Sequence, residues 1–170
     1  MRRLLFALTL TLLAPTVLST AGCKNEPTIP GTEIPDTKDN RAILQTLERY
    51  RTAIVQKDAA TVLASAHPTY LDEAGTEDPS DDVVYEELGP MLRRRLAQVD
   101  SIRFTMDYTE IHVVGDRAVV HAWMDASFRM KPLLASDGQP RNQPDYVRKQ
   151  DHVEFHLVRE GESWLITSGL

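Results

Sequence analysis

The sequence is poor in cysteine: Cys23 is the single one among 170 residues. A lone thiol excludes a disulfide within the chain, even in an oxidising compartment. The sequence also lacks three arrangements that carry catalysis, namely an ordered Ser-His-Asp triad, a glycine-rich phosphate loop and a cysteine nucleophile. These absences leave no starting hypothesis in the triad-hydrolase, nucleotide-binding or thiol-enzyme classes.

Basic residues are scarce too, with 19 Lys and Arg against 25 Asp and Glu and a formal net charge of −6. No basic stripe with interleaved aromatic residues runs along the chain, so we expect no nucleic-acid partner. A long hydrophobic run is also missing. The most apolar stretch, residues 4–18, is shorter than the roughly 20 residues that cross a bilayer as a helix. A short transmembrane anchor therefore stays as an alternative interpretation only.

The start of the chain instead has the three parts of a secretory signal. A basic start at Arg2 and Arg3 precedes the apolar run, and residues 19–22 are small. Thr-Ala-Gly-Cys at residues 20–23 resembles the lipobox of bacterial lipoproteins. The resemblance implies cleavage before Cys23, a diacylglyceryl thioether on its sulfur and an acylated amino group, such as one carrying palmitate. An ordinary signal followed by an incidental cysteine stays open as the alternative.

Cleavage before Cys23 would leave 17 Lys and Arg against 25 Asp and Glu, a net charge of −8, because Arg2 and Arg3 are removed. Such acidity disfavours electrostatic binding to anionic headgroups, so the lipid would provide the membrane contact. Lys24 follows the cysteine where many inner-membrane lipoproteins have an aspartate. The lipoprotein resemblance therefore implies a bacterial envelope protein, lipid-anchored in the outer membrane and facing the periplasm.

Three segments make up the predicted organisation. A signal peptide covers residues 1–22, a lipidated cysteine and flexible tether cover residues 23–38, and one domain covers residues 39–170. The tether assignment rests on three prolines and a lack of periodicity in residues 24–36. No internal repeat is visible.

Apolar residues at helical spacing predict three helices at the start of the domain. Thr37 or Asp39 can cap the first helix, and Asp58 can cap a short second one. Ser80 is expected to cap a third helix over residues 83–96. A Gly-Pro pair within this third helix should kink or split it.

The rest of the domain has the composition of strands. Residues 102–114 and 117–130 alternate apolar and polar side chains around a Gly-Asp pair, the pattern of a β-hairpin with a two-residue turn. Two further strands are expected in residues 148–159 and 163–167, after a long loop that contains prolines. Helices followed by four antiparallel strands predict an α+β domain, in which three N-terminal helices pack on one face of a curved sheet.

The hairpin also predicts side-chain facing, because a two-residue turn places Tyr108 opposite Trp123. Four large apolar side chains would then lie on the outer face of the sheet: Phe104, Met106, Tyr108 and Trp123. Since aromatic residues and methionine are enriched at interfaces, we expect a homodimer through this open face. A β-bulge between residues 105 and 110 would instead turn part of this set inward.

Histidines are the remaining polar candidates in the strands. Glu110 faces His121 in the same pairing, while His152 and His156 share a face of the next predicted strand, roughly 13 Å apart. These four side chains are expected on one solvated sheet face. No His-x-x-x-His pair lies in a predicted helix, so we expect no metal and no other cofactor.

Four stretches together resemble the NTF2-like superfamily, which includes SnoaL-like and other cystatin-like α+β domains. They are residues 47–58, 67–72, 114–120 and 157–166, and the resemblance covers residues 40–168. It implies a cone, in which a bent sheet wraps around the first helices and leaves a pocket at its wide end. Members include isomerases, cyclases, dehydratases and many non-catalytic binding or accessory domains.

A fold that enzymes and non-enzymes share settles little about activity. We expect a membrane-anchored envelope lipoprotein with a non-catalytic domain that binds a small apolar ligand in the cone or has an accessory role. One alternative is a structural subunit of an envelope complex. The other is a pocket isomerase or dehydratase similar to the ketosteroid isomerases.

The isomerase resemblance implies two catalytic residues. Tyr50 matches the tyrosine of that family's first helix, and Asp72, three residues before Gly75, matches its general base. A carboxylate would then move a proton beside a carbonyl while neutral donors hold the enolate oxygen. The structural alternatives are a half-buried core residue for Tyr50 and a turn or cap residue for Asp72.

A third match to the isomerases is out of register. Asp151, followed by His152, resembles the protonated aspartate of a late strand. In that family the aspartate lies about six residues before a glycine turn, and the residue six before Gly161 is Phe155. We therefore expect Asp151 to be an exposed strand residue.

Overall fold

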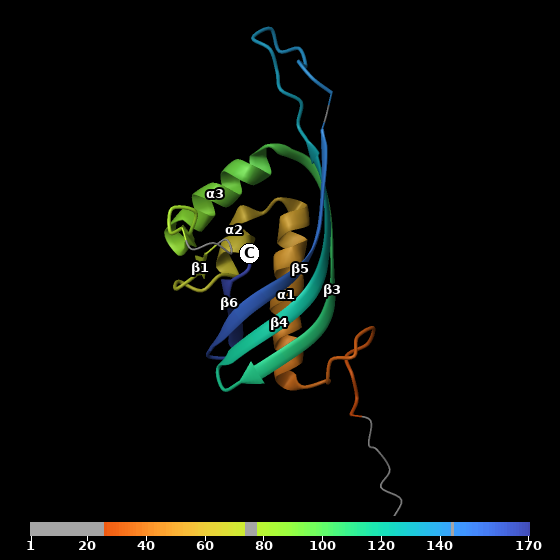
Figure 1. The fold of residues 1–170 in the computed structure, drawn as a ribbon, viewed down its shortest axis with the longest axis vertical. Helices are drawn as coiled ribbons and strands as arrows, with labels where there is room; N and C mark the ends of the chain where they lie inside the picture. Colours follow the sequence, from red (N-terminus) through yellow and green to blue (C-terminus); the bar gives the residue numbers. More distant parts are fainter. Residues whose placement is uncertain (1–25, 74–77, 144) are drawn as a thin grey trace, which may run out of the picture.

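The computed structural model of the chain describes residues 26–73, 78–143 and 145–170. The expected signal peptide at residues 1–22 and the expected lipidation site Cys23 lie outside these described residues. Figure 1 shows a bent sheet that contains long strands, with the helices gathered on one side of it.

In the described part of the chain the helices precede the long strands. They are α1 (Lys38–Gln56), α2 (Ala59–Ala64) and α3 (Tyr85–Ala97). Two short strands, β1 (Leu71–Asp72) and β2 (Val83–Val84), pair with each other between α2 and α3. The α+β class predicted from the sequence is confirmed, although α2 is only six residues long.

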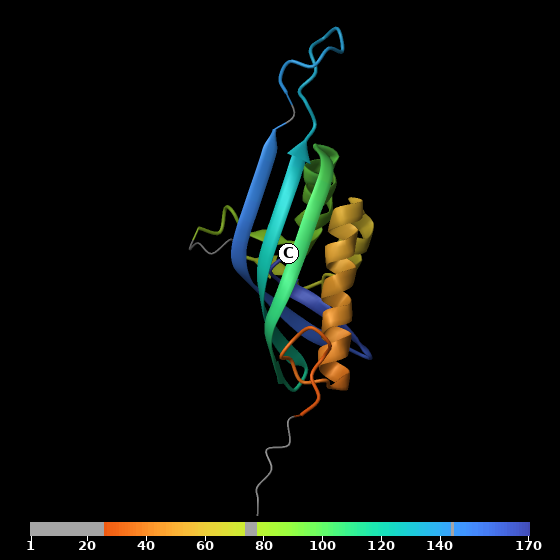
Figure 2. The ribbon, with the colours of Figure 1, turned by 90° about the vertical axis from the view of Figure 1, so that its right-hand side faces the viewer.

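The main sheet consists of β3 (Val99–Val114), β4 (Arg117–Met130), β5 (Tyr146–Glu160) and β6 (Ser163–Ser168). The strands lie in the order β3-β4-β5-β6, and every neighbouring pair is antiparallel. This confirms the predicted four-stranded antiparallel sheet. Figure 2 shows α1 lying along one face of the sheet, which we call the inner face.

Helix α1 is fixed at both ends by local interactions. Thr37, one of its two predicted caps, accepts a hydrogen bond from the Asn40 backbone N–H at 3.1 Å. Lys57 closes the helix in the left-handed conformation, at φ 58°. Asp39, the other predicted cap, instead accepts two hydrogen bonds of 2.8 Å from the Arg159 guanidinium, which ties the start of α1 to β5.

The turn between β3 and β4 forms as predicted. Gly115 takes a positive φ of 60°, and with Asp116 it makes the two-residue connection. Glu110 then pairs with His121, as a regular ladder requires. The prediction therefore holds for the part of the hairpin nearest the turn.

A bulge at Thr109 shifts the register of β3 farther from the turn. Tyr108 pairs with Ala122 rather than with the predicted Trp123. The Thr109 hydroxyl donates a hydrogen bond to the His121 carbonyl at 3.1 Å. One extra residue in β3 thus turns the side chains from Ile102 to Tyr108 to the face opposite the predicted one.

The facing predicted from a regular ladder is consequently wrong for three of its four apolar residues. Phe104 and Met106 lie on the inner face, where they are 4% and 8% exposed, and Tyr108 lies beside them. Trp123 stays on the outer face. The homodimer stays a prediction, but a patch of four large apolar groups no longer supports it.

The third helix starts later than predicted. The two valines expected at its start form β2 instead, because β-branched residues favour strands and β1 offers a partner. The helix begins at Tyr85 without a side-chain cap and runs through Pro90 as one helix. Ser80, the predicted cap, lies in a turn where its backbone N–H donates to Asp78 Oδ1 at 2.9 Å.

The segment before α1 is folded where the sequence predicts an extended tether. Residues 27–36 turn back at Gly31 (φ 82°), and the Ile29 N–H donates to the Ile34 carbonyl at 2.9 Å. Ile34 is 1% exposed, so this turn contributes an apolar side chain to the core. The folded region therefore begins before residue 38.

The end of the chain packs tightly against β5. Gly169 has φ 97°, and an added Cβ would lie 2.4 Å from the Glu154 carbonyl oxygen. We expect Gly169→Ala to lower the free energy of unfolding by about 2 kcal/mol or more, because left-handed strain adds to a backbone clash. Gly138→Ala is the matched control, since Gly138 has φ 80° but open space around it. Urea unfolding measures both, and equal losses would contradict the tight packing.

Candidate functional site

Tyr50 projects from α1 into the interior, where it is 7% exposed. Its ring meets Phe104 of β3 and Phe155 of β5 edge-on, each at a centroid distance of 5.9 Å. Burial raises the pKa of the Tyr50 phenol well above its ordinary value, so the group is neutral at physiological pH. Tyr50 is thus a packed core residue with a protonated hydroxyl.

Asp72 lies in β1 and contacts a second buried tyrosine. Its Oδ2 accepts a hydrogen bond from the Tyr70 hydroxyl at 3.2 Å, and that hydroxyl accepts one from the Leu170 N–H at 3.1 Å. Burial raises the pKa of Tyr70, and the negative charge of Asp72 raises it further. Tyr70 is 2% exposed. A buried phenol that the sequence analysis did not identify therefore donates a hydrogen bond to Asp72, the candidate general base.

Tyr50 and Tyr70 belong to one cluster of buried side chains, and Tyr108 packs against that cluster. Tyr108 donates a hydrogen bond to Glu48 Oε1 at 2.9 Å, and Arg51 Nε donates to the other oxygen of Glu48 at 2.8 Å. Burial raises the pKa of Tyr108, as it does those of Tyr50 and Tyr70, so the core contains three neutral phenols. A regular ladder predicts an outward-facing Tyr108, and the bulge at Thr109 turns it inward instead.

Tyr50 is part of one continuous cluster of buried side chains. The largest fully buried apolar side chains are Trp164, Phe155, Ile34, Ile43, Leu47, Leu88, Leu157, Ile166, Val62 and Val120. Phe155 occupies the position six residues before Gly161, where the isomerase resemblance implies an aspartate. Asp151 pairs with Met124 and is exposed, as the sequence predicts. The structure does not bring Asp151 to Tyr50.

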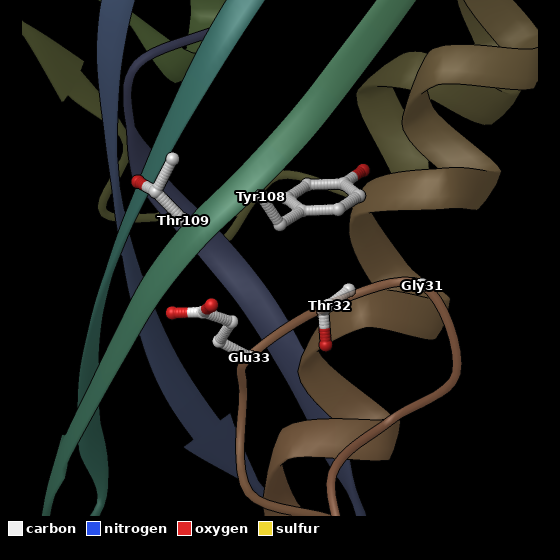
Figure 3. Close-up of a pocket in the computed structure, with 5 residues that line it drawn as sticks. All are labelled: Gly31, Thr32, Glu33, Tyr108 and Thr109. Carbon is white, nitrogen blue, oxygen red and sulfur yellow. The ribbon is translucent and has the colours of Figure 1, made fainter.

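A surface hollow lies where the N-terminal turn meets the bulge of β3. It has a volume of about 460 Å³ and is lined by Gly31, Thr32, Glu33, Tyr108 and Thr109. Figure 3 shows the Glu33 carboxylate reaching toward β3 while the Tyr108 ring extends from β3 toward α1. Glu33 is the one charged group of this lining, so the hollow lacks the converging polar groups of an active site.

The predicted polar face lies on the outer side of the sheet, away from α1. Glu110, His121, His152 and His156 share it, as the sequence predicts. His112, which the sequence analysis did not identify, lies on the same face, and its Nε2 is 2.8 Å from Glu110 Oε1. The missed signal is the spacing of two residues, which puts both side chains on one face of a strand.

The predictions about membrane attachment rest on residues that the structure does not describe. Cys23 belongs to that part of the chain. Among the helices that are described, none is both long enough and apolar enough to cross a bilayer. Lipidation at Cys23 therefore stays a prediction.

Comparisons with known proteins give matches at the level of structure. No protein-family model matches the chain, and no curated protein does. The Kfla4162 protein from Kribbella flavida is 20% identical with a TM-score of 0.62, over 77% of this chain and 87% of that one. A candidate dehydratase of the NTF2-like family from Streptomyces avermitilis is 16% identical with a TM-score of 0.56, over 76% of this chain and 92% of that one.

A candidate scytalone dehydratase from Novosphingobium aromaticivorans is similar in the same way. It is 11% identical with a TM-score of 0.61, over 76% of this chain and 80% of that one. Identities this low show a shared architecture and not a shared activity. The bent four-stranded antiparallel sheet with α1 along its inner face agrees with these matches. The chain therefore shares the α+β fold of these proteins, one of which is of the NTF2-like family.

Proposed function

We propose that this protein is a bacterial envelope lipoprotein, anchored through lipid on Cys23, whose NTF2-like domain has a non-catalytic binding or accessory role. The lipobox-like residues 20–23 after an apolar run support the anchor. Lys24 in place of an aspartate supports the outer membrane, with the domain facing the periplasm. The filled interior supports the non-catalytic role.

The contact between Phe155 and Tyr50 is the main support for a domain without catalytic activity. Phe155 is 1% exposed and its ring lies 5.9 Å from that of Tyr50. An apolar ring thus occupies the position from which, by the isomerase resemblance, a protonated aspartate would donate to an enolate oxygen. One of the two donors that would stabilise the enolate is missing from this interior position.

Three further features belong to the proposal. A small apolar ligand in the cone would have to displace some of the side chains packed around Tyr50. A homodimer through the open sheet face has the support of Trp123, which stays on that face. A structural role in an envelope complex would use the same open surfaces.

The second candidate function is an isomerase or dehydratase that uses Tyr50 and Asp72. The neutral phenol of Tyr50 and the carboxylate of Asp72, hydrogen-bonded to Tyr70, favour it. The structural matches described as dehydratases also fit this candidate.

A steroid isomerase assay separates the two candidates. The purified protein beginning at Lys24 keeps the whole hydrophobic core, which is drawn from residues 34–170. We expect no turnover of a β,γ-unsaturated ketosteroid above the buffer rate, and no difference between wild type, Tyr50→Phe and Asp72→Asn. Turnover that falls by about 10²–10⁴-fold in Asp72→Asn would contradict the non-catalytic proposal, because that is the contribution of a general base.

A further inference from the structure

The outer face of the sheet carries a compact cluster of metal-ligating side chains. Glu110 and His112 come from β3 and His121 comes from β4, and one ligand atom of each lies within 4.8 Å of the others. The pairing of Glu110 with His121 brings the two strands together here. Four of the five histidines of the chain lie on this face, and two of them, His112 and His121, belong to the cluster.

The backbone under the cluster fixes the positions from which these side chains leave the sheet. Glu110 and His112 are two residues apart in one strand, so their side chains leave the same face of the sheet. The bulge at Thr109 ends just before Glu110, and the tight turn at Gly115 follows three residues after His112. The three ligands therefore stand on a short hairpin segment that is fixed at both ends.

A carboxylate on the neighbouring strand supports the cluster from the other side. Glu154 of β5 pairs with His121, and its Oε2 lies 3.5 Å from His121 Nδ1. The other oxygen of Glu154 lies 2.6 Å from His156 Nε2. A carboxylate at one ring nitrogen fixes the orientation of a histidine and leaves the other nitrogen for a metal.

We propose that Glu110, His112 and His121 bind one divalent transition-metal ion of the zinc type, with Glu154 as the group that orients His121. Two imidazoles and one carboxylate form a donor set that suits zinc, and zinc sites with three protein ligands keep a further position for water or substrate. A tetrahedral ion with bonds of about 2.0–2.1 Å needs ligand atoms about 3.3 Å apart. The observed span of at most 4.8 Å closes to that value through side-chain rotations.

Exposure makes such rotations easy. The side chains of Glu110 and His112 are 57% and 58% exposed, and that of His121 is 40% exposed. His112 and His121 each lie beside a glutamate, and the carboxylates of Glu110 and Glu154 lower the cost of bringing a cation to this face. The position is open to water, which is where a bound ion would keep its remaining coordination site.

Zinc titration followed by calorimetry tests the site. The protein is the untagged chain beginning at Lys24, freed of metal with a chelator that is then removed. We expect saturable binding of one Zn²⁺ per chain. His112→Gln and His121→Gln should each weaken binding by more than the roughly 10–100-fold that loss of a supporting partner costs, and Glu154→Gln by about tenfold.

Two matched variants complete the test. His152→Gln changes a histidine on the same face whose ring meets Trp123 edge-on, and His67→Gln changes one in the segment after α2, where its Nδ1 is hydrogen-bonded to the Thr69 hydroxyl. Both should bind zinc as the wild type does. Thermal unfolding in chelator should be the same for all variants, because the altered side chains are not part of the core. Absence of saturable zinc binding, or binding that is equal in wild type, His112→Gln and His121→Gln, would overturn the proposal.

Discussion

Phe155→Ala is expected to lower the free energy of unfolding by about 3–5 kcal/mol, the range for removing a large aromatic side chain from a core. Phe155 is 1% exposed in β5 and pairs with Val120 of β4, which is fully buried. Its ring also packs edge-on against Tyr50 of α1. One substitution thus loosens the sheet and the helix that crosses it, and the loss is a large share of the roughly 5–15 kcal/mol that stabilises a typical domain.

Tyr146→Ala is the control for that measurement. Tyr146 lies in the same strand but is 72% exposed, so its loss should change the free energy of unfolding by no more than about 0.5 kcal/mol. Equilibrium unfolding in urea gives both values. A cost below about 1 kcal/mol for Phe155→Ala would show that the interior around Tyr50 is loosely packed. In that case the interior has room for a ligand, and the packing of Phe155 against Tyr50 no longer supports a non-catalytic domain.

Cys23→Ser is expected to abolish acylation of the protein completely. The cysteine sulfur is the atom to which the lipoprotein resemblance assigns the diacylglyceryl group, and serine offers no thiol for the thioether. Each buried methylene of an acyl chain contributes about 0.8 kcal/mol to membrane binding, so loss of the lipid removes most of the attachment. Labelling with radioactive palmitate in a bacterial host should fall to background, and the protein should be released or mislocalised.

Thr20→Leu is the matched control for the lipid experiment. Lipoboxes more often have leucine or another aliphatic residue at this position, so this variant should be labelled at least as well as the wild type. Cell fractionation then compares the three proteins. Label that persists in Cys23→Ser would place the acyl group elsewhere and would remove the basis for the anchor.

Features set by neighbouring residues were predictable from the sequence. The turn at Gly115 follows from a glycine between two alternating stretches, since it can adopt the positive φ that the connection requires. The caps at Thr37 and Asp58 follow from side chains that accept hydrogen bonds from backbone N–H groups two or three residues later. Each of these interactions lies within a few residues of chain.

The bulge in β3 is visible in the sequence as a change in the alternation of apolar residues, which a prediction based on a regular ladder does not take into account. Its inward apolar residues have even numbers from Ile102 to Tyr108 and odd numbers from Ile111, whereas the inward residues of β4 keep one parity from Ala118 to Phe128. Such a change of phase means one extra residue in the first strand. A hairpin with this extra residue has Phe104, Met106 and Tyr108 on the inner face. Of the four apolar residues predicted to face outward, only Trp123 then remains on the outer face.

The surroundings of Asp72 could not be predicted in this way. Its partner Tyr70 is a near neighbour, but the Tyr70 hydroxyl also binds the backbone of Leu170, 100 residues away in the sequence. The start of α3 likewise depends on β1, because Val83 and Val84 pair with β1 as strand β2 instead of joining the helix. Contacts of this kind depend on how distant segments fold together, and local patterns of apolar and polar residues do not record them.

The mass of the mature N-terminus tests the central claim most directly. The full precursor is expressed in a bacterium, extracted from membranes with detergent, and its N-terminal peptide is weighed. The lipoprotein account predicts a peptide that begins at Cys23 and carries a diacylglyceryl group and an amide-linked acyl chain. An unmodified Cys23, or an N-terminus at any other residue, would contradict the account.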